Sequence, residues 1–168
     1  MLSRQNAVKW LKEGAGFLLL LFLLSRLINY WHSPSEVPET LPDLQGRTLS
    51  GEPVEEILSR PGPIIIHFWG TWCPVCRTEA SNIAAAARRY PVLTVAVNSG
   101  SSEDLRRWMD QRGLTYPVLN DPSGTLARRF GIDVYPTTFI YDDSRRLKFV
   151  ESGYITTAGL LARMKMAE

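Results

Sequence analysis

The apolar residues of this chain form runs of two kinds. One long run, residues 14–31, contains a single charged residue, Arg26. Two shorter runs, residues 63–70 and 92–98, are rich in β-branched residues and are bounded by glycine, proline or asparagine. Short apolar runs between turn residues are typical of strands buried on both faces. The pattern therefore predicts a long apolar helix, followed by a domain whose sheet lies inside its core.

Helical patterns lie between and after these strands. Residues 73–90 contain four consecutive alanines and end in basic residues, and residues 101–113 open with serine and acidic residues and close with glycine. The remaining signals predict a short hairpin at 46–53, a helical turn at 54–60, a strand at 116–121, a short helix at 123–131, a hairpin around a turn at 142–144, and a closing helix at 156–168. Strands that alternate with helices in this way indicate an α/β layered domain.

The long apolar run has the length of a membrane span. At 1.5 Å per residue, residues 14–31 reach about 27 Å as a helix, close to the roughly 30 Å hydrocarbon core of a bilayer. A cleaved signal peptide and a buried core helix are the alternatives. The residues after Leu24 offer no small-x-small cleavage site, and Tyr30 and Trp31 suit the aromatic belt of an interface. An uncleaved transmembrane anchor is therefore favoured, with Arg26 extending its charge to the headgroups.

Charges on the two sides of this run predict its orientation. The basic residues before it are Arg4, Lys9 and Lys12, and the acidic residues after it are Glu36, Glu39 and Asp43. By the positive-inside rule, residues 1–13 stay in the cytoplasm and the rest of the chain is exported. For a bacterium, this predicts a single-pass protein of the inner membrane with its folded domain in the periplasm, where thiol pairs persist in the oxidised state.

Residues 32–43 are predicted to form a linker, since Pro34, Pro38 and Pro42 favour an extended, semi-rigid tether. The remaining residues, 44–168, suit a single domain. The whole chain of 168 residues has a formal net charge of +2, from 19 basic and 17 acidic side chains. So small an excess gives no electrostatic reason to expect binding to a nucleic acid.

The only two cysteines of the chain are Cys73 and Cys76. Cys73 falls at the predicted junction between the first buried strand and the long helix, with Pro74 at a position where a missing N–H costs least. Free amides and the helix dipole stabilise an anion there, so the pKa of Cys73 is expected to fall from about 8.5 into the range of roughly 3.5 to 7.5. Cys76 lies one turn further on, close enough to resolve a mixed disulfide. The spacing predicts one reversible two-electron site.

Other uses of a C-x-x-C pair find less support. A zinc site needs about four ligands, and beyond the cysteines the chain offers only His32 and His67. A c-type haem attachment requires histidine where the chain has Arg77. A copper-binding pair and a purely structural disulfide stay open, although no methionine or histidine cluster supports the first and so short a loop gives the second little entropic stabilisation. Redox catalysis is the favoured interpretation.

Two segments give the chain a family resemblance. FWGTWCPVCRTEA, residues 68–80, and GIDVYPTTFIYD, residues 131–142, resemble the thioredoxin superfamily, in particular its membrane-anchored TlpA/ResA/CcmG-like branch and the ScsD-like proteins. The resemblance covers residues 44–168 and implies a thioredoxin-like fold, with a central mixed sheet flanked by helices and an inserted helix-strand unit. The peroxiredoxin pattern P-x-x-x-T-x-x-C is absent, because Ile66 and Gly70 occupy its proline and threonine positions. Peroxidase activity is therefore not expected.

The resemblance also implies roles for residues around the cysteines. Pro136 corresponds to a cis-proline loop that faces the pair and presents backbone to an extended substrate, and Tyr135 is implied to contact that substrate. Trp72, Pro74 and Val75 are implied in substrate binding or in tuning the redox potential.

Glu79 and His67 each have two interpretations. Glu79 matches an acidic residue that is linked to proton handling in ResA-like proteins, yet it can equally be a solvated first-turn acid that favours the helix dipole. His67 stands where thioredoxin has a buried aspartate below the cysteines, but a lone histidine in an apolar strand is usually a hydrogen-bonded core residue. A proton-relay role stays open for both residues.

As a member of this branch, the chain is expected to be a membrane-anchored periplasmic thiol:disulfide oxidoreductase acting through Cys73 and Cys76. The resemblance implies exported thiol or disulfide proteins as substrates, connected with cytochrome c maturation or copper stress, and a membrane electron donor of the DsbD type. No cofactor and no metal are expected. The alternative is a module that handles copper or haem with the cysteine pair as ligands.

Overall fold

The computed structural model describes residues 10, 13–17, 19–20, 23–24 and 37–168. The chain divides into two units, Met1–Ser33 and Pro34–Glu168. Most of the predicted cytoplasmic segment 1–13, more than half of the anchor 14–31 and residues 32–36 of the predicted linker lie outside the described residues. The rest of the predicted linker, residues 37–43, contacts the folded domain: the Leu41 amide donates to the Arg145 carbonyl at 2.9 Å, and the Leu147 amide donates to the Glu39 carbonyl at 2.8 Å. Within the part of the chain that the structure describes, no helix has both the length and the apolar character needed to cross a bilayer. The anchor therefore stays a prediction.

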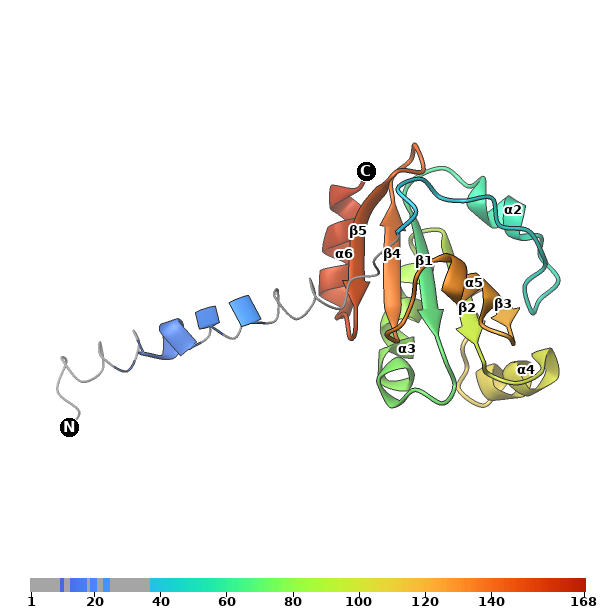
Figure 1. Cartoon of the computed structure of the whole chain (residues 1–168), viewed down its shortest axis with the longest axis horizontal. Coiled ribbons are helices and arrows are strands. Elements are labelled where there is room, and N and C mark those ends of the chain that lie inside the picture. Colours follow the sequence, from blue (N-terminus) through green and yellow to red (C-terminus); the bar gives the residue numbers. More distant parts are fainter. Residues whose placement is uncertain (1–9, 11–12, 18, 21–22, 25–36) are drawn as a thin grey trace. The chain divides into compact units, whose positions relative to one another are not determined.

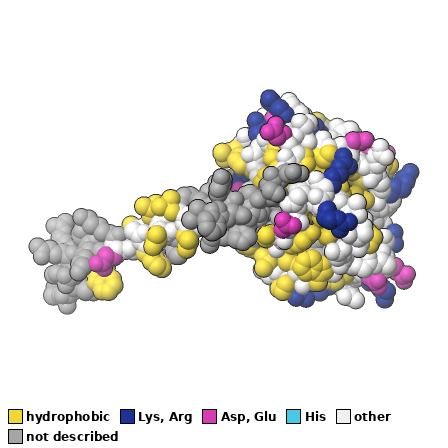
Figure 2. Space-filling view, in the orientation of Figure 1, with side chains coloured by type: hydrophobic (Ala, Val, Ile, Leu, Met, Phe, Trp, Pro, Cys, Tyr) yellow, Lys and Arg dark blue, Asp and Glu magenta, His cyan; other side chains and the backbone are white. Residues whose placement is uncertain are grey.

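The described residues of the first unit carry exposed apolar side chains (Figure 2). Phe17 is 60% exposed and Leu20 is 62% exposed. Soluble proteins rarely expose a contiguous group of large apolar side chains unless another surface or a membrane covers it.

The second unit contains each element that the sequence predicts for it, with slightly shorter bounds (Figure 1). Its described helices are α2 (Val54–Leu58), α3 (Pro74–Ala87), α4 (Ser102–Asp110), α5 (Thr125–Arg129) and α6 (Thr157–Met166). Its described strands are β1 (Ile64–Trp69), β2 (Val92–Val97), β3 (Val118–Asp121), β4 (Thr137–Tyr141) and β5 (Leu147–Ser152). The hairpin predicted at 46–53 is a tight turn closed by an antiparallel bridge between Arg47 and Pro53.

The strand β1 lies at the centre of a five-stranded mixed sheet with the order β3-β2-β1-β4-β5. It pairs in parallel with β2 and antiparallel with β4, and all six of its residues are buried. This confirms the prediction of a central strand that is buried on both faces. The chain that leaves β1 after Trp69 therefore emerges from the middle of the sheet.

Helices cover both faces of this sheet, so the domain has three layers (Figure 1). Successive side chains of a strand point to opposite faces. Ile65 and Trp69 of β1 belong to the core shared with α3, α4 and α6, whereas Ile64 and Phe68 belong to the core shared with α2 and α5. The cysteine pair is part of the first core, with Cys73 at the amino end of α3 and Cys76 in its first turn.

The predicted serine cap begins α4. Ser101 Oγ accepts a hydrogen bond from the Asp104 amide at 3.1 Å, and the Asp104 carboxylate accepts one from the Ser101 amide at 3.2 Å. This reciprocal pair satisfies two amides that the helix itself leaves without partners.

Asp121 fixes the start of α5 from the end of β3. Its buried carboxylate accepts hydrogen bonds from the amides of Thr125, at 2.8 Å, and Ala127, at 3.0 Å. The N-cap residue itself is Gly124, which has a φ of 68° and no side chain to cap with. The aspartate therefore supplies the acceptors that a polar N-cap residue ordinarily provides.

We expect Asp121→Ala to lower the free energy of unfolding by about 2 to 3 kcal/mol, because two amides lose a charged acceptor in a buried site. Urea denaturation of the full-length protein, followed by circular dichroism, measures this change. Asp121→Asn keeps one acceptor and should lose about half as much. Ser123→Ala removes an exposed hydroxyl nearby and should cost less than about 0.5 kcal/mol. Equal losses for Asp121→Ala and Ser123→Ala would contradict this role.

Candidate active site

The end of β1 and the start of α3 place the cysteine pair. Cys73 is the N-cap residue of α3, with extended backbone angles, and Pro74 is the first helical residue. The Cys73 amide donates to the Gly70 carbonyl at 3.1 Å, which closes the loop between strand and helix. Cys73 and Cys76 form a disulfide, with their Cα atoms 5.3 Å apart. The predicted position of Cys73, at the junction of strand and helix, is confirmed.

The amino end of α3 favours negative charge on the first sulfur. Cys73 Sγ accepts a hydrogen bond from the Cys76 amide at 3.2 Å, in the way an N-cap side chain does. Such amides and the positive end of the helix dipole stabilise a thiolate. Both cysteines are buried in this oxidised form. A lowered pKa of the Cys73 thiol is the expectation for the reduced form.

The second sequence motif lies directly against the first. Tyr135-Pro136 is a cis peptide bond, as expected from the resemblance. Cys73 Sγ lies 3.7 Å from the Tyr135 carbonyl oxygen. The Pro136 carbonyl accepts a hydrogen bond from the Gly153 amide at 2.8 Å, which ties this loop to the end of β5. The fold thus brings residues 73 and 135 together, although 62 positions separate them in the sequence.

Exposed apolar side chains surround the disulfide. The Trp72 side chain is 51% exposed, and its ring contacts Tyr135 edge to face, with the ring centroids 5.3 Å apart. Pro74 and Val75 are exposed on the first turn of α3. Of the residues predicted for substrate binding, Trp72, Pro74 and Val75 are thus exposed next to Cys73, whereas Tyr135 is half-buried and Pro136 is buried.

Glu79 lies inside the protein, one turn after Cys76 on α3. Its side chain is 0% exposed, and Oε1 accepts a hydrogen bond from the Ile155 amide at 3.1 Å. Oε2 has no hydrogen-bond partner among the described residues. Burial raises the pKa of Glu79 to about 8, although the Ile155 amide favours the ionised form. The alternative that Glu79 is a solvated first-turn acid is therefore wrong, because the helix face that carries it packs against the 155 segment.

The Glu79 carboxyl shares its surroundings with Tyr116. Burial raises the pKa of the Tyr116 hydroxyl, and the nearby charge of Glu79 raises it further. Tyr116 also contacts Trp69, with the ring centroids 6.4 Å apart. A protonated Glu79 is thus the form that this apolar, aromatic environment favours at neutral pH.

His67 is a buried core residue on β1. Its Nδ1 lies 2.9 Å from Thr138 Oγ1, its cross-strand partner on β4. Burial lowers the pKa of His67 to about 3. The imidazole is therefore neutral across the pH range in which thiols ionise, and it has the hydrogen bond expected of a core histidine.

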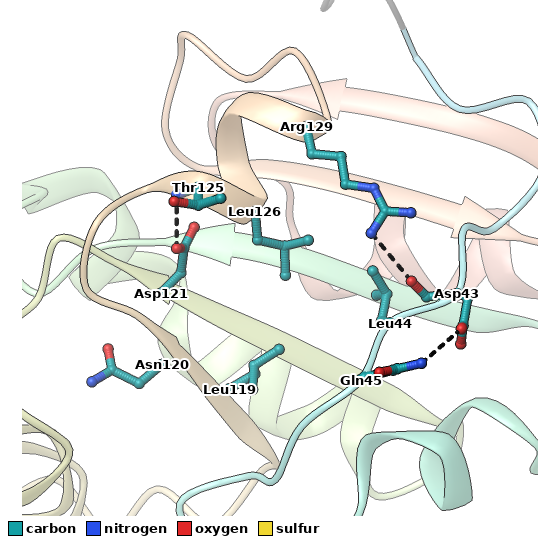
Figure 3. Close-up of a pocket in the computed structure, with 9 residues that line it drawn as sticks. All are labelled: Asp43, Leu44, Gln45, Leu119, Asn120, Asp121, Thr125, Leu126 and Arg129. Carbon is teal, nitrogen blue, oxygen red and sulfur yellow. Dashed lines mark hydrogen bonds between the residues drawn. The ribbon is translucent and has the colours of Figure 1, made fainter.

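A cavity of about 510 Å³ lies between α5 and the segment before the first strand (Figure 3). Arg129 extends from α5 toward that segment and donates to the Asp43 carbonyl at 3.3 Å. The lining residues are Asp43, Leu44, Gln45, Leu119, Asn120, Asp121, Thr125, Leu126 and Arg129. None of them is a predicted site residue, so this cavity is separate from the disulfide. Among the described residues, no group of three or more histidine, cysteine or acidic side chains is arranged to hold a metal ion.

Sequence reasoning missed the backbone groups that complete the site. The Val97 carbonyl accepts from the Trp72 indole, and the Ile155 amide donates to Glu79. Both belong to segments whose side chains carry no catalytic signal. Backbone contacts of this kind depend on the fold and not on residue type, so no local pattern could have indicated them.

Comparison with known proteins identifies the family of this chain. The profile of the AhpC/TSA family matches residues 37–150. The chain belongs to the AhpC/TSA family. Its relatives include a thioredoxin-like protein of Haemophilus influenzae, which is 32% identical over 95% of this chain and 96% of its own length. The thiol-disulfide oxidoreductase ResA of Geobacillus thermodenitrificans is 27% identical over 82% of this chain and 86% of its own length.

Solved structures of similar fold include a thiol-disulfide isomerase. A secreted thiol-disulfide isomerase of Corynebacterium glutamicum superposes with a TM-score of 0.66 and 25% identity, covering 74% of this chain and 82% of that protein. The fold is therefore thioredoxin-like, and this AhpC/TSA-family protein is a thiol-disulfide oxidoreductase of the DsbE/ResA type, with its cysteine pair at disulfide distance.

Proposed function

We propose that this oxidoreductase is anchored in the bacterial inner membrane and reduces disulfides of selected exported proteins in the periplasm. The observation that carries the assignment of disulfide exchange to Cys73 is the contact between the two motifs. Cys73 Sγ lies 3.7 Å from the Tyr135 carbonyl, at the amino end of α3. An extended substrate chain that pairs with the loop at Tyr135 would bring its own sulfur to Cys73.

The reaction moves two electrons from the reduced pair to the substrate. The Cys73 thiolate attacks one sulfur of the substrate disulfide, and the other substrate sulfur leaves as a thiolate. The Cys76 thiolate then attacks Cys73 Sγ, so that the mixed disulfide breaks and the second substrate thiolate leaves. The substrate ends reduced, and the pair ends as the disulfide that this structure contains. No cofactor takes part.

Glu79 is assigned the proton transfer that the second step requires. Cys76 must lose its proton before it can attack, and Glu79 follows it by one helical turn on the same face. A carboxyl group with a pKa of about 8 is close in acidity to a thiol, so that proton transfer between them costs little. His67, whose pKa is lowered to about 3, is a much weaker base and is assigned no proton transfer.

Exposed apolar side chains in the first unit support the membrane anchor. Phe17 and Leu20 are more than half exposed, and a bilayer would cover such apolar side chains. Residues 32–36 would then connect the anchor to the domain, because the chain is already hydrogen-bonded to the domain at Glu39 and Leu41. Exported thiol proteins, such as those of cytochrome c maturation or copper stress, are the proposed substrates. Because the periplasm is oxidising, a membrane donor of the DsbD type is proposed to return electrons to the pair.

Trapping in cells tests this proposal. Full-length Cys76→Ser cannot resolve the mixed disulfide, so we expect substrates to accumulate on Cys73 and to be released by dithiothreitol. Mass spectrometry identifies them, and the variant lacking both cysteines is the matched control. Exported proteins should dominate the adducts. Exclusively cytoplasmic adducts would contradict the proposed topology, and an adduct yield equal to that of the double variant would contradict the proposed reaction.

A further inference from the structure

The chain makes a tight turn after β2, and this turn places the Ser99 hydroxyl beside the last residue of that strand. Asn98 has a φ of 47°, in the left-handed region that asparagine tolerates better than most residues. Ser99 follows it and is 8% exposed. Ser99 Oγ donates to the Val97 carbonyl at 2.9 Å.

The same hydroxyl holds the active-site loop. Ser99 Oγ accepts a hydrogen bond from the Thr71 amide at 3.0 Å. Thr71 directly precedes Trp72, and the Trp72 indole donates to the Val97 carbonyl at 3.0 Å. Ser99 thus contacts both the backbone before Trp72 and the carbonyl group that holds the Trp72 ring.

Trp72 is restrained on its other sides as well. Its ring lies so close to Gly70 that a Cβ atom added there would be 2.5 Å from the indole nitrogen. Tyr135 contacts the ring edge to face. An aromatic side chain that is 51% exposed ordinarily has several rotamers available. The contacts that hold the Trp72 ring in one orientation therefore suggest a function for that orientation.

We propose that Ser99 is a positioning residue, which fixes Trp72 in the orientation that a polypeptide substrate meets beside Cys73. This inference rests on the proposed reduction of protein disulfides. Holding a side chain in its bound orientation lowers the entropy that binding must overcome. A long polypeptide contacts Trp72 as it docks, whereas a small disulfide reaches Cys73 without that contact. Ser99 should therefore affect protein substrates selectively.

Steady-state kinetics of full-length Ser99→Ala test this inference. Loss of the hydroxyl leaves the Thr71 amide without its acceptor, and we expect KM for a protein disulfide such as insulin to rise about fivefold, with kcat nearly unchanged. Reduction of 5,5′-dithiobis(2-nitrobenzoate) should change by less than about twofold, and the redox potential of the pair should stay the same. Ser99→Thr keeps the hydroxyl and should restore most of the loss. Equal effects on both substrates, or none on insulin, would overturn the proposal.

A double-mutant cycle separates positioning from general damage. If Ser99 acts through Trp72, adding Ser99→Ala to Trp72→Ala should raise KM for insulin no further. Additive effects would refute the link between the two residues.

Hydrogen exchange of the Trp72 indole N–H gives a readout that does not depend on activity. Its NMR signal is assigned by comparison with Trp72→Phe. In the wild type we expect exchange at least tenfold slower than in free tryptophan, and in Ser99→Ala faster exchange. Exchange as fast as in free tryptophan in the wild type would overturn the positioning role, even if insulin proved not to be a substrate.

Discussion

Cys73→Ser is expected to abolish the reduction of protein disulfides, lowering the rate by about a thousandfold or more, because the variant lacks the attacking sulfur. Turbidity from the reduction of insulin by dithiothreitol measures the rate. The structure explains why this sulfur and not the second one should attack. Cys73 Sγ accepts a hydrogen bond from the Cys76 amide at the amino end of α3, and it lies 3.7 Å from the Tyr135 carbonyl oxygen. Cys76 lies deeper in the helix.

Cys76→Ser provides the matched comparison for this prediction. It keeps the attacking sulfur and should complete the first step, so it should give a stable adduct in a single turnover with no further cycling. Cys73→Ser should form no adduct at the remaining thiol at a comparable rate. Wild-type rates for Cys73→Ser, together with tight copper binding by the wild type, would instead support the alternative of a metal-handling module.

Local sequence signals predicted the elements that carry the cysteine pair. The apolar run at 63–70 became the central strand because a continuous apolar run between turn residues suits burial on both faces, and the run of alanines after Cys76 lies in α3 because alanine has the highest helix propensity. Pro74 and the cysteine before it marked the start of the helix. The cis bond at Pro136 came only from the family resemblance, since no property of the Tyr135-Pro136 dipeptide distinguishes it from an ordinary turn.

The environments of Glu79 and Ser99 depend on tertiary contacts that local sequence signals do not reveal. Glu79 has the sequence pattern of a solvated helix acid, but the structure places it beyond the first turn of α3, and the approach of residue 155, which lies 76 positions away, makes it a buried carboxyl. Ser99 likewise has no motif of its own, and its contact with Thr71 spans 28 positions. The inserted helix-strand unit and the membrane anchor rest on the resemblance and on the apolar pattern, respectively, and both stay predictions.

Glu79→Gln is expected to stabilise the oxidised protein in alkaline solution. Burial raises the pKa of Glu79 from 4.5 to about 8 in the folded protein. Between these values the folded state holds a proton that the unfolded state has lost, so the free energy of unfolding falls as the pH rises. This contribution is fully present below pH 4.5 and is lost as the pH rises through about 8.

Glutamine does not titrate, and its carbonyl oxygen can still accept the Ile155 amide. We therefore expect similar urea midpoints for wild type and Glu79→Gln at pH 5, and greater stability of the variant by about 2 to 4 kcal/mol at pH 9. Glu103→Gln changes an exposed acid in the first turn of α4 and should follow the wild type at both values. If Glu79→Gln and wild type were equally stable at pH 9, the carboxyl could not be as buried as it is here.

The pH profile of the second chemical step shows whether this buried carboxyl also transfers protons. Glu79 can accept the Cys76 proton only when ionised, so release of a preformed mixed disulfide by the wild type should accelerate as the pH rises toward 8. Glu79→Gln has no such base, so its rate near pH 7 should be at most about one tenth of the wild-type rate. Its pH–rate profile should follow the ionisation of the Cys76 thiol alone. Coincident profiles for the two proteins would leave Glu79 with an effect on stability only, because a group that relays the proton must impose its own pKa on the rate.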